Sequence, residues 1–376
     1  MKVSVFERMS LAAAKHGAVN LGQGFPDFGW PDEILEAAAR ALKEGSNQYA
    51  PSRGLPQLRQ AIADHYGRHF GEVINPEQVC VTSGATEALG AMILATVEPG
   101  DEVVIFTPAY DSYAPMIRRA GATPREVALR PPHWRIDRDA LSAAINTKTR
   151  AIIFNNPQNP TGRLYGKEEL QIIADVAIEH DLTVISDEVW EHVLLHGETF
   201  TPFATLPDMA ERTLKAGSAG KIFSLTGWKV GWIVAPPQKA AVAARAHQFL
   251  TFATAPNLQE AVAFGLGEDG WIQPMRQRFS RALGRMSDGL IKAGYSVLEP
   301  ASTYFLCVDL RESGIDVEDE EFAKVAVEQA GVAAVPVSAF AEGNPSRHLV
   351  RLCFAKRDET IDAGVAAMAR AKELFA

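Results

Sequence analysis

Seven short apolar runs alternate with longer amphipathic stretches between residues 78 and 234. Runs such as AIIFN (151–155) and TVIS (183–186) carry apolar side chains at consecutive positions, so both faces of each strand must be covered. Such alternation predicts an α/β domain with a mostly parallel sheet between helices. The predicted strands are Gln78–Thr82, Glu102–Phe106, Arg125–Leu129, Ala151–Asn155, Thr183–Ser186, Thr213–Ala216 and Val230–Val234.

The pattern changes after about residue 255, which predicts a second, smaller α+β domain. We expect a large domain over 30–255 and a small one made of 1–29 and 256–376, since 376 residues exceed what one core usually holds. The predicted small-domain elements are helices at Gln273–Lys292, Glu318–Gln329 and Ile361–Leu374, and strands at Tyr304–Asp309, Ala333–Val337 and Leu349–Phe354.

Charge and cysteine content narrow the possible partners. The net charge is −9, and no Lys/Arg block stands out, so neither nucleic acid nor an anionic membrane is expected as a partner. Cys80, Cys307 and Cys353 each sit singly in apolar runs, which indicates buried free thiols and no metal cluster. The N-terminus MKVSVFERMS lacks the apolar core of a signal peptide, so we expect a cytoplasmic protein.

The segment KAGSAGKIFSLTGWKVGW (215–232) is the most informative. A predicted strand ends in small residues directly before Lys221, and small residues allow a bulky ligand to approach the backbone. Strand ends in α/β sheets are where ligands bind. A partly desolvated lysine there can act as an amine nucleophile. Taken alone, a lysine in such a Gly/Ser loop is far more often a solvated surface residue.

The surrounding motifs decide between these readings. Ser218-x-x-Lys221 followed by GWKVG resembles the signature of class I/II aminotransferases, which belong to the fold-type-I pyridoxal-phosphate enzymes. The resemblance extends over nearly the whole chain and is closest to the kynurenine/glutamine/methionine aminotransferase branch. Its other motifs, in order, are VNLGQGFPDF, NQYAPSRG, VTSGATEAL, PGDEVVIFTPAYDSY, NNPQNPTG, SDEVW and VRLCFAK.

The resemblance gives Lys221 and three other residues roles in the reaction. Lys221 would hold pyridoxal 5'-phosphate through a Schiff base and move the substrate's Cα proton. Asp187 would pair with the pyridine nitrogen, whereas residue chemistry alone leaves it as a helix cap or a partner of a structural arginine. Asn159 would donate to the cofactor's phenolic oxygen, although Asn-Pro is also a plain turn signal. Arg351 would bind the substrate carboxylate bidentately; its alternative partner is a structural carboxylate.

The remaining site residues are implied in the same way. Ala85 and Thr86, at a predicted helix N-terminus, would hold the phosphate, a role compatible with simple capping. Tyr110 would lie on the pyridine ring, or alternatively pack in the core. Substrate would also meet Gly24 and Phe6. The resemblance implies further phosphate contacts from Ser218, Lys229 and, from the neighbouring subunit of a homodimer, Tyr49.

Three positions depart from the usual family pattern. Lys229 replaces an arginine and would contact phosphate as a point charge, and Gly220 replaces a serine. Trp190 stands where most relatives have a tyrosine that donates to the cofactor's phenolic oxygen. An indole N–H can donate but cannot ionise. We therefore expect an altered Schiff-base pKa, a shifted ring, or no direct contact at Trp190.

The reaction implied is ping-pong transfer of an amino group from an L-amino acid to a 2-oxo acid. Phe6, Phe25, Tyr110 and Trp190 favour Met, Gln, aromatic or kynurenine-like donors, and no second arginine can be assigned to a distal carboxylate. One alternative is β-elimination from cysteine S-conjugates, which also begins with removal of the Cα proton. A more remote alternative is a non-catalytic ligand-binding module on the same fold.

Overall fold

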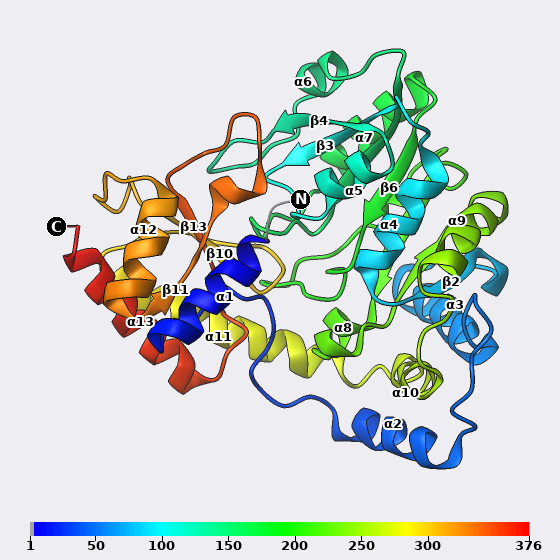
Figure 1. The fold of residues 1–376 in the computed structure, drawn as a ribbon, viewed down its shortest axis with the longest axis horizontal. Helices are drawn as coiled ribbons and strands as arrows, with labels where there is room; N and C mark the ends of the chain where they lie inside the picture. The colour runs from blue at the N-terminus through cyan, green and yellow to red at the C-terminus, as the bar shows by residue number, and fades with distance from the viewer. Residues whose placement is uncertain (1–3, 376) are drawn as a thin grey trace.

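The computed structural model describes residues 4–375 and is built around one seven-stranded sheet (Figure 1). The strand order is β2-β8-β7-β6-β5-β3-β4. All neighbouring strands run parallel except β8, which is antiparallel to both β2 and β7. The strands are β2 (Val79–Thr82), β3 (Glu102–Thr107), β4 (Thr123–Ala128), β5 (Thr149–Asn155), β6 (Thr183–Asp187), β7 (Thr213–Ser218) and β8 (Gly231–Val234).

Helices cover both faces of this sheet, as predicted from strands that are apolar at consecutive positions. Val103 and Ile105 pack on one face with helices α4, α5 and α9, while Val104 and Phe106 pack on the other with α6 and α7. Helices α2, α3 and α10 cover that second side near β2 and β8. These helices are α2 (Asp32–Glu44), α3 (Pro56–Phe70), α4 (Ala85–Thr96), α5 (Tyr113–Arg119), α6 (Arg138–Ala143), α7 (Lys167–Glu179), α9 (Pro237–Leu250) and α10 (Pro256–Leu266).

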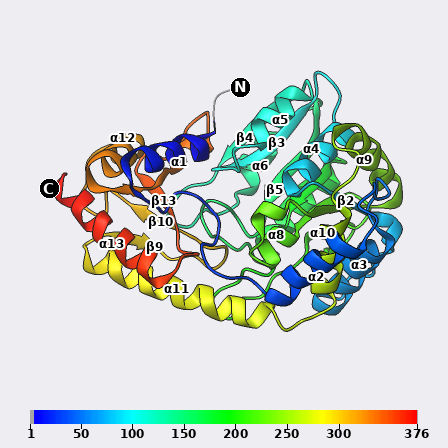
Figure 2. The same cartoon turned by 60° about the horizontal axis from the view of Figure 1, so that its bottom comes forward.

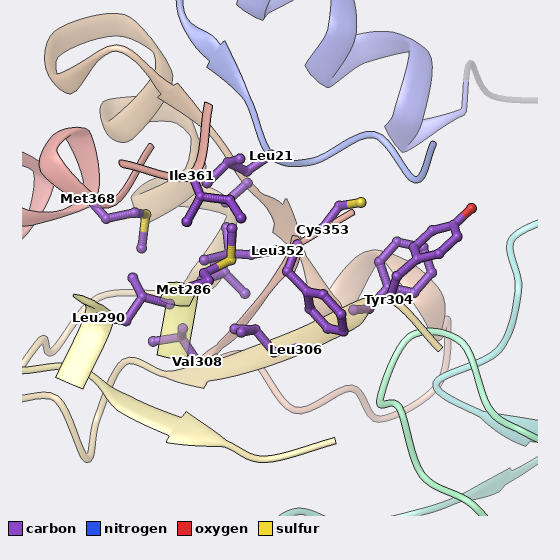
Figure 3. Packing of buried hydrophobic residues seen from close by; sticks show 14 of the residues in the cluster. Leu21, Met286, Leu290, Tyr304, Leu306, Val308, Leu352, Cys353, Ile361 and Met368 are labelled. Atoms are coloured by element: carbon purple, nitrogen blue, oxygen red, sulfur yellow. The ribbon is translucent and has the colours of Figure 1, made fainter. Parts of the chain in front are cut away.

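A second core lies around a four-stranded antiparallel sheet in the order β12-β13-β10-β9. The long helix α11 runs from the neighbourhood of α2 toward this part of the molecule (Figure 2). Figure 3 shows part of this core, in which side chains of α11 and α13 meet those of β10 and β13. The elements are α11 (Ile272–Lys292), β9 (Ser296–Leu298), β10 (Phe305–Asp309), α12 (Asp319–Val325), β12 (Val335–Pro336), β13 (Leu349–Cys353) and α13 (Asp358–Glu373).

The N-terminal segment joins this second core. Helix α1 (Val5–His16) is followed by β1 (Val19–Asn20), which pairs in parallel with β11 (Val332–Ala333). We propose the division into 30–255 and 1–29 with 256–376 as two domains. The β1–β11 pairing supports it, whereas α10, which begins at Pro256, packs against α2 and α3 of the large part.

Two predicted elements of the small part differ from the structure. The strand predicted at 333–337 is split, because β11 pairs with β1 while β12 pairs with β13. The helix predicted at 318–329 is α-helical only to Val325, and a π-helical turn (Ala326–Ala330) completes it. Both differences depend on the partners these short segments meet, which lie far away in the sequence.

Two further expectations concern cysteines and membranes. Cys80, Cys307 and Cys353 are all buried free thiols. No helix within residues 4–375 combines the length and the apolar character needed to cross a bilayer.

Candidate active site

The predicted site residues follow strands whose ends meet at one edge of the large sheet. Asn155, Asp187 and Ser218 are the last residues of β5, β6 and β7, which run in parallel. Strand β8 runs in the opposite direction, so Lys229, just before its start, reaches the same edge. Gly231 lies in register between Thr82 and Ser218. A side chain at Gly231 would come within 2.6 Å of the Ala85 nitrogen, so glycine brings Lys229 close to the start of α4.

Lys221 belongs to the short helix α8 (Ala219–Ile222), directly after β7, and its side chain is part-buried. Its Nζ donates a 3.1 Å hydrogen bond to the Tyr304 hydroxyl and lies 4.6 Å from the centre of the Trp190 ring. Burial lowers the pKa of Lys221 to about 8, opposed by Asp187 and assisted by Arg351 and Lys229. A useful fraction of the amine is therefore neutral near physiological pH.

The small residues before Lys221 serve packing as well as access. A side chain at Gly217 would come within 2.1 Å of the Trp232 indole nitrogen, and one at Gly220 within 3.0 Å of Thr226 Cα. Ala216 and Ala219 are buried in the cores on the two sides of the sheet. At Gly217 the interpretation of smallness as ligand access was thus wrong, because the adjacent Trp232 ring fills that space.

Asp187 is buried at the end of β6, where Tyr113 donates a 2.5 Å hydrogen bond to its Oδ2. Burial raises the pKa of Asp187 to about 6, while the Tyr113 bond and the Val189 N–H oppose this rise. Tyr113 was not among the predicted site residues. Its only signal was its place in PAYDSY, just after a strand end.

Arg351 is fully buried in the middle of β13 and contacts three segments of the chain. It donates 2.7 Å hydrogen bonds from Nη1 to Asn159 Oδ1 and from Nη2 to the Gly22 carbonyl. Its guanidinium lies 3.9 Å from the Phe305 ring centre and 4.9 Å from that of Phe6. Burial lowers its pKa to about 10.

The Arg351 guanidinium lacks an acidic partner. Within residues 4–375 it forms no ion pair shorter than 4.0 Å, and its Nε has no hydrogen-bond partner. Leaving a buried charge unpaired is costly. The structural-carboxylate alternative for Arg351 therefore has no support here, and the arrangement suits the carboxylate of a ligand.

Asn155, the last residue of β5, holds two parts of the site together. Its Nδ2 donates to the Asp187 carbonyl at 2.8 Å, and its Oδ1 accepts from the Asn159 N–H at 2.7 Å. Asn159, in turn, bonds to Arg351 as described above. The amide of Asn155 thus fixes Asp187 relative to the Asn159–Arg351 pair.

A basic recess lies where α4 begins. Gly84 adopts a φ of +79°, and a side chain there would come within 3.0 Å of the Lys229 Nζ atom. Helix α4 begins at Ala85, so its first free N–H groups lie beside this ammonium. Thr86 Oγ1 is 3.4 Å from the Tyr110 hydroxyl. A helix N-terminus with an adjacent ammonium can bind an anionic group such as a phosphate.

Other predicted residues lie around the cleft or away from it. Trp190 is buried and meets the Tyr304 ring edge-on at 4.5 Å. Gly24 accepts a 2.9 Å hydrogen bond from the Tyr304 hydroxyl through its carbonyl. Tyr49, by contrast, is 86% exposed and contacts only Phe252 among aromatic rings of the described chain. It takes no part in this cleft within one subunit.

A possible metal-binding group lies outside the cleft. The ligand atoms of the buried residues His65, Glu191 and His192 lie within 4.8 Å of one another. The two histidine Nε2 atoms are 2.8 Å apart and share a hydrogen bond, while Glu191 accepts one from Tyr66. His65 Nδ1 and Glu191 Oε2 are buried without a hydrogen-bond partner among the residues that the structure describes.

Comparison with known proteins gives consistent matches over almost the whole chain. Residues 16–368 match the family described as aminotransferase class I and II. The chain is 37% identical to the methionine aminotransferase of Escherichia coli, over 99% of this chain and 96% of that one. It is 36% identical to the kynurenine–oxoglutarate transaminase of Dictyostelium discoideum, over 95% and 92%. The structure of N-succinyldiaminopimelate aminotransferase from Mycobacterium tuberculosis superposes with a TM-score of 0.95 at 43% identity, covering 98% and 97%.

Proposed function

The chain belongs to the class I and II aminotransferases, and on that premise we propose which residues carry the reaction and which substrates it takes. It is a pyridoxal-phosphate-dependent transaminase that moves an amino group from an amino acid to a 2-oxo acid. The observation that carries the assignment is a pair of cations without acidic partners in the described part of the chain, the part-buried Lys221 and the fully buried Arg351. Lys221 bonds to a tyrosine and Arg351 to an amide and a carbonyl, and neither forms an ion pair within residues 4–375.

The residues present fit the cofactor. The N-terminus of α4 with Ala85 and Thr86, the Lys229 ammonium and Ser218 would hold its phosphate. Gly84 leaves the recess open beside Lys229, where a side chain would intrude. Asp187 would lie at the pyridine nitrogen, Asn159 at the phenolic oxygen, and Tyr110 and Trp190 against the ring. When bound, the cofactor supplies a carbonyl carbon that takes the amino group and a ring that withdraws electrons from Cα.

The chain's own groups bind the substrate and move its proton. Arg351 binds the α-carboxylate, helped by Asn159, and thereby fixes the direction of the Cα–H bond. Lys221 Nζ, neutral in part because its pKa is about 8, removes the Cα proton and holds it. Trp190 and Tyr304 both lie against the amine.

Borohydride reduction of the holoenzyme tests the role of Lys221. Reduction should attach the cofactor irreversibly to Lys221, as peptide mass mapping would show, and Lys221→Ala should abolish both the adduct and transamination. Lys239→Ala is a matched control, because burial also lowers the pKa of Lys239. Its amine bonds to Thr183, the first residue of β6, at the opposite end of that strand from Asp187. An adduct on another lysine, or activity kept in Lys221→Ala, would refute the assignment.

Apolar and aromatic walls favour Met, Gln, aromatic or kynurenine-like donors. Phe6 packs against Phe340 at 5.6 Å over Arg351, and Trp190 lines the Lys221 side. The methionine and kynurenine relatives agree with this proposal. An N-acylated diamino acid is the second candidate, because the Mycobacterium tuberculosis enzyme named above is the N-succinyldiaminopimelate aminotransferase.

A screen of amino donors against several 2-oxo acids decides between these donors. We expect Met or an aromatic donor to give the highest kcat/KM, and dominance of aspartate would contradict the proposal. Release of pyruvate and ammonia from a cysteine S-conjugate without an oxo acid would show β-elimination as well.

We also propose a homodimer in which Tyr49 serves the neighbouring subunit's phosphate site. Tyr49 is 86% exposed, and Phe249 and Phe252 close by in the fold are 87% and 43% exposed. Exposed aromatic groups of this kind mark interfaces. If Tyr49 acts across the interface, inactive Lys221→Ala subunits mixed with Tyr49→Ala subunits should form hybrids with one intact site and regain activity. Mixing would restore nothing if Tyr49 served its own subunit.

A further inference from the structure

Tyr304 has a hydrogen-bonding arrangement that is fixed in direction. Its hydroxyl lies 2.9 Å from the Gly24 carbonyl, which can only accept, so the hydroxyl proton points to Gly24. The Lys221 Nζ atom lies 3.1 Å from the same oxygen and must therefore be the donor. Tyr304 thus offers the amine a lone pair and has no proton to give it.

The surroundings keep Tyr304 neutral and immobile. The ring is fully buried, and burial raises the pKa of the hydroxyl well above its usual value. Trp190 meets the ring edge-on at 4.5 Å, and Phe279 and Phe305 pack against it at 5.7 and 4.9 Å. Figure 3 shows Tyr304 at the edge of the small-domain core, with its hydroxyl directed away from the other labelled side chains.

The loop that accepts the hydrogen bond from the Tyr304 hydroxyl also accepts one from Arg351. Gly22 and Gly24 belong to this loop, and Arg351 donates to the Gly22 carbonyl. Asn20 Oδ1 accepts from the N–H groups of Gly22 and Gln23 at 3.1 and 3.0 Å, which fixes the loop. A side chain at Gly24 would come within 2.5 Å of the Phe305 ring, so the loop lies tightly on β10. One rigid segment therefore positions both the amine and the guanidinium.

We propose that Tyr304 is a positioning residue that holds the Lys221 amine in register with the carboxylate site at Arg351. The proposal rests on the proposed role of Lys221 in moving the Cα proton. Tyr304 would act through geometry, as it fixes where Nζ stands relative to a substrate anchored by Arg351. It would take no proton itself.

The test compares Tyr304→Phe with Tyr295→Phe. Both variants keep a buried ring and lose a hydroxyl that donates to a backbone carbonyl; for Tyr295 this is Met368, in the small-domain core. The titratable groups that act on Lys221, namely Cys353, Asp187, Arg351 and Lys229, are unchanged in both. Near-ultraviolet circular dichroism and melting temperature report whether each variant folds.

The first readout needs no cofactor turnover. The rate at which a small amine-selective reagent labels Lys221 in the apoenzyme, followed by mass spectrometry across pH, gives the pKa of the amine. Accepting a bond favours the ammonium more than the neutral amine, so Tyr304→Phe should lower this pKa by about half a unit to one unit. The second readout is steady-state kinetics, in which Tyr304→Phe should lower kcat at least about tenfold with little change in KM for the donor.

Each outcome bears on the proposal. A lower labelling pKa together with a lower kcat, both absent in Tyr295→Phe, supports it. An unchanged labelling pKa in Tyr304→Phe overturns the proposal. So does a lower pKa with a normal kcat, and so does an effect on KM without an effect on kcat. If Lys221→Ala kept activity, the proposed function would fail, while the labelling experiment would still report the Tyr304–Lys221 contact.

Discussion

The hydroxyl of Tyr113 donates a 2.5 Å hydrogen bond to the Asp187 carboxylate, and both side chains are buried. Burial raises the pKa of Asp187 to about 6, and this bond holds it from rising further. In the proposed role at a pyridine nitrogen, Asp187 would be useful only as a carboxylate. We therefore expect the pair to set the lower end of the pH range in which the enzyme works.

Replacing Tyr113 by phenylalanine should shift this limit. Losing a bond to a charged acceptor raises the pKa of Asp187 by about one unit. The acid limb of the kcat/KM profile should move upward by the same amount, measured from about pH 5 to 9. Tyr295→Phe should leave the limb unchanged. An unmoved limb in Tyr113→Phe would show that Asp187 does not limit activity at low pH.

Arg351→Lys should show how much of the binding of the substrate carboxylate depends on the geometry of the guanidinium and how much on its charge. Lysine keeps the positive charge but lacks the planar fork that binds a carboxylate with two bonds. We expect kcat/KM for the amino donor to fall by about 10- to 100-fold, mainly through a higher KM. Arg285→Lys alters an exposed pair with Asp362 and should have little effect. Equal losses in the two variants would argue against a substrate role for Arg351.

Asn155→Ala should affect both stability and activity. It removes the bonds to the Asp187 carbonyl and the Asn159 N–H and leaves both groups buried without that partner. The free energy of unfolding should fall by about 1–3 kcal/mol, as urea titration would measure, and kcat/KM should fall as Asn159 loses its position. Gln60→Ala, which removes an exposed amide bond to Asp64, is the control. A stability equal to that of this control would contradict the bridging role.

Two buried histidines, His65 in α3 and His192 just after β6, should make the stability of the protein fall in acid. Burial, with help from His69 and Arg68, lowers the pKa of His65 from 6.5 to about 3, and burial also lowers that of His192. Between those values the unfolded chain binds more protons than the folded one, so stability is lost as pH falls below about 6.5. Each histidine contributes a slope of about 1.4 kcal/mol per pH unit.

Denaturant titrations at pH 7.0, 6.0 and 5.0 measure this slope. In His192→Gln one protonation site is gone, so the loss of unfolding free energy between pH 6 and 5 should be shallower by about 1 kcal/mol. His196→Gln, which replaces an exposed histidine, is the control variant. Parallel curves for His192→Gln and wild type would mean that His192 is not held neutral.

The strands and the central residues of the site could be predicted because their signals are local. All seven strands of the large sheet were predicted to within a few residues, and in strands such as β3 and β5 the signal is a run of apolar residues at consecutive positions, because both faces are covered. Lys221, Asp187 and Arg351 stood in recognisable motifs. Tyr304 and Tyr113 had no such signal, because their partners Lys221 and Asp187 lie 83 and 74 residues away. Asn155 ends a predicted strand, and nothing local indicates its contacts with Asp187 and Asn159.

The complete burial of Arg351 has a kinetic consequence. With no surface open to water, its guanidinium cannot be reached by an incoming carboxylate in this conformation. Phe6, at the start of α1, lies over it together with Phe340. If Arg351 binds the substrate carboxylate as proposed, one of these rings must move when a substrate enters or a product leaves. A substitution on α1 that touches no reacting atom would then change the turnover rate.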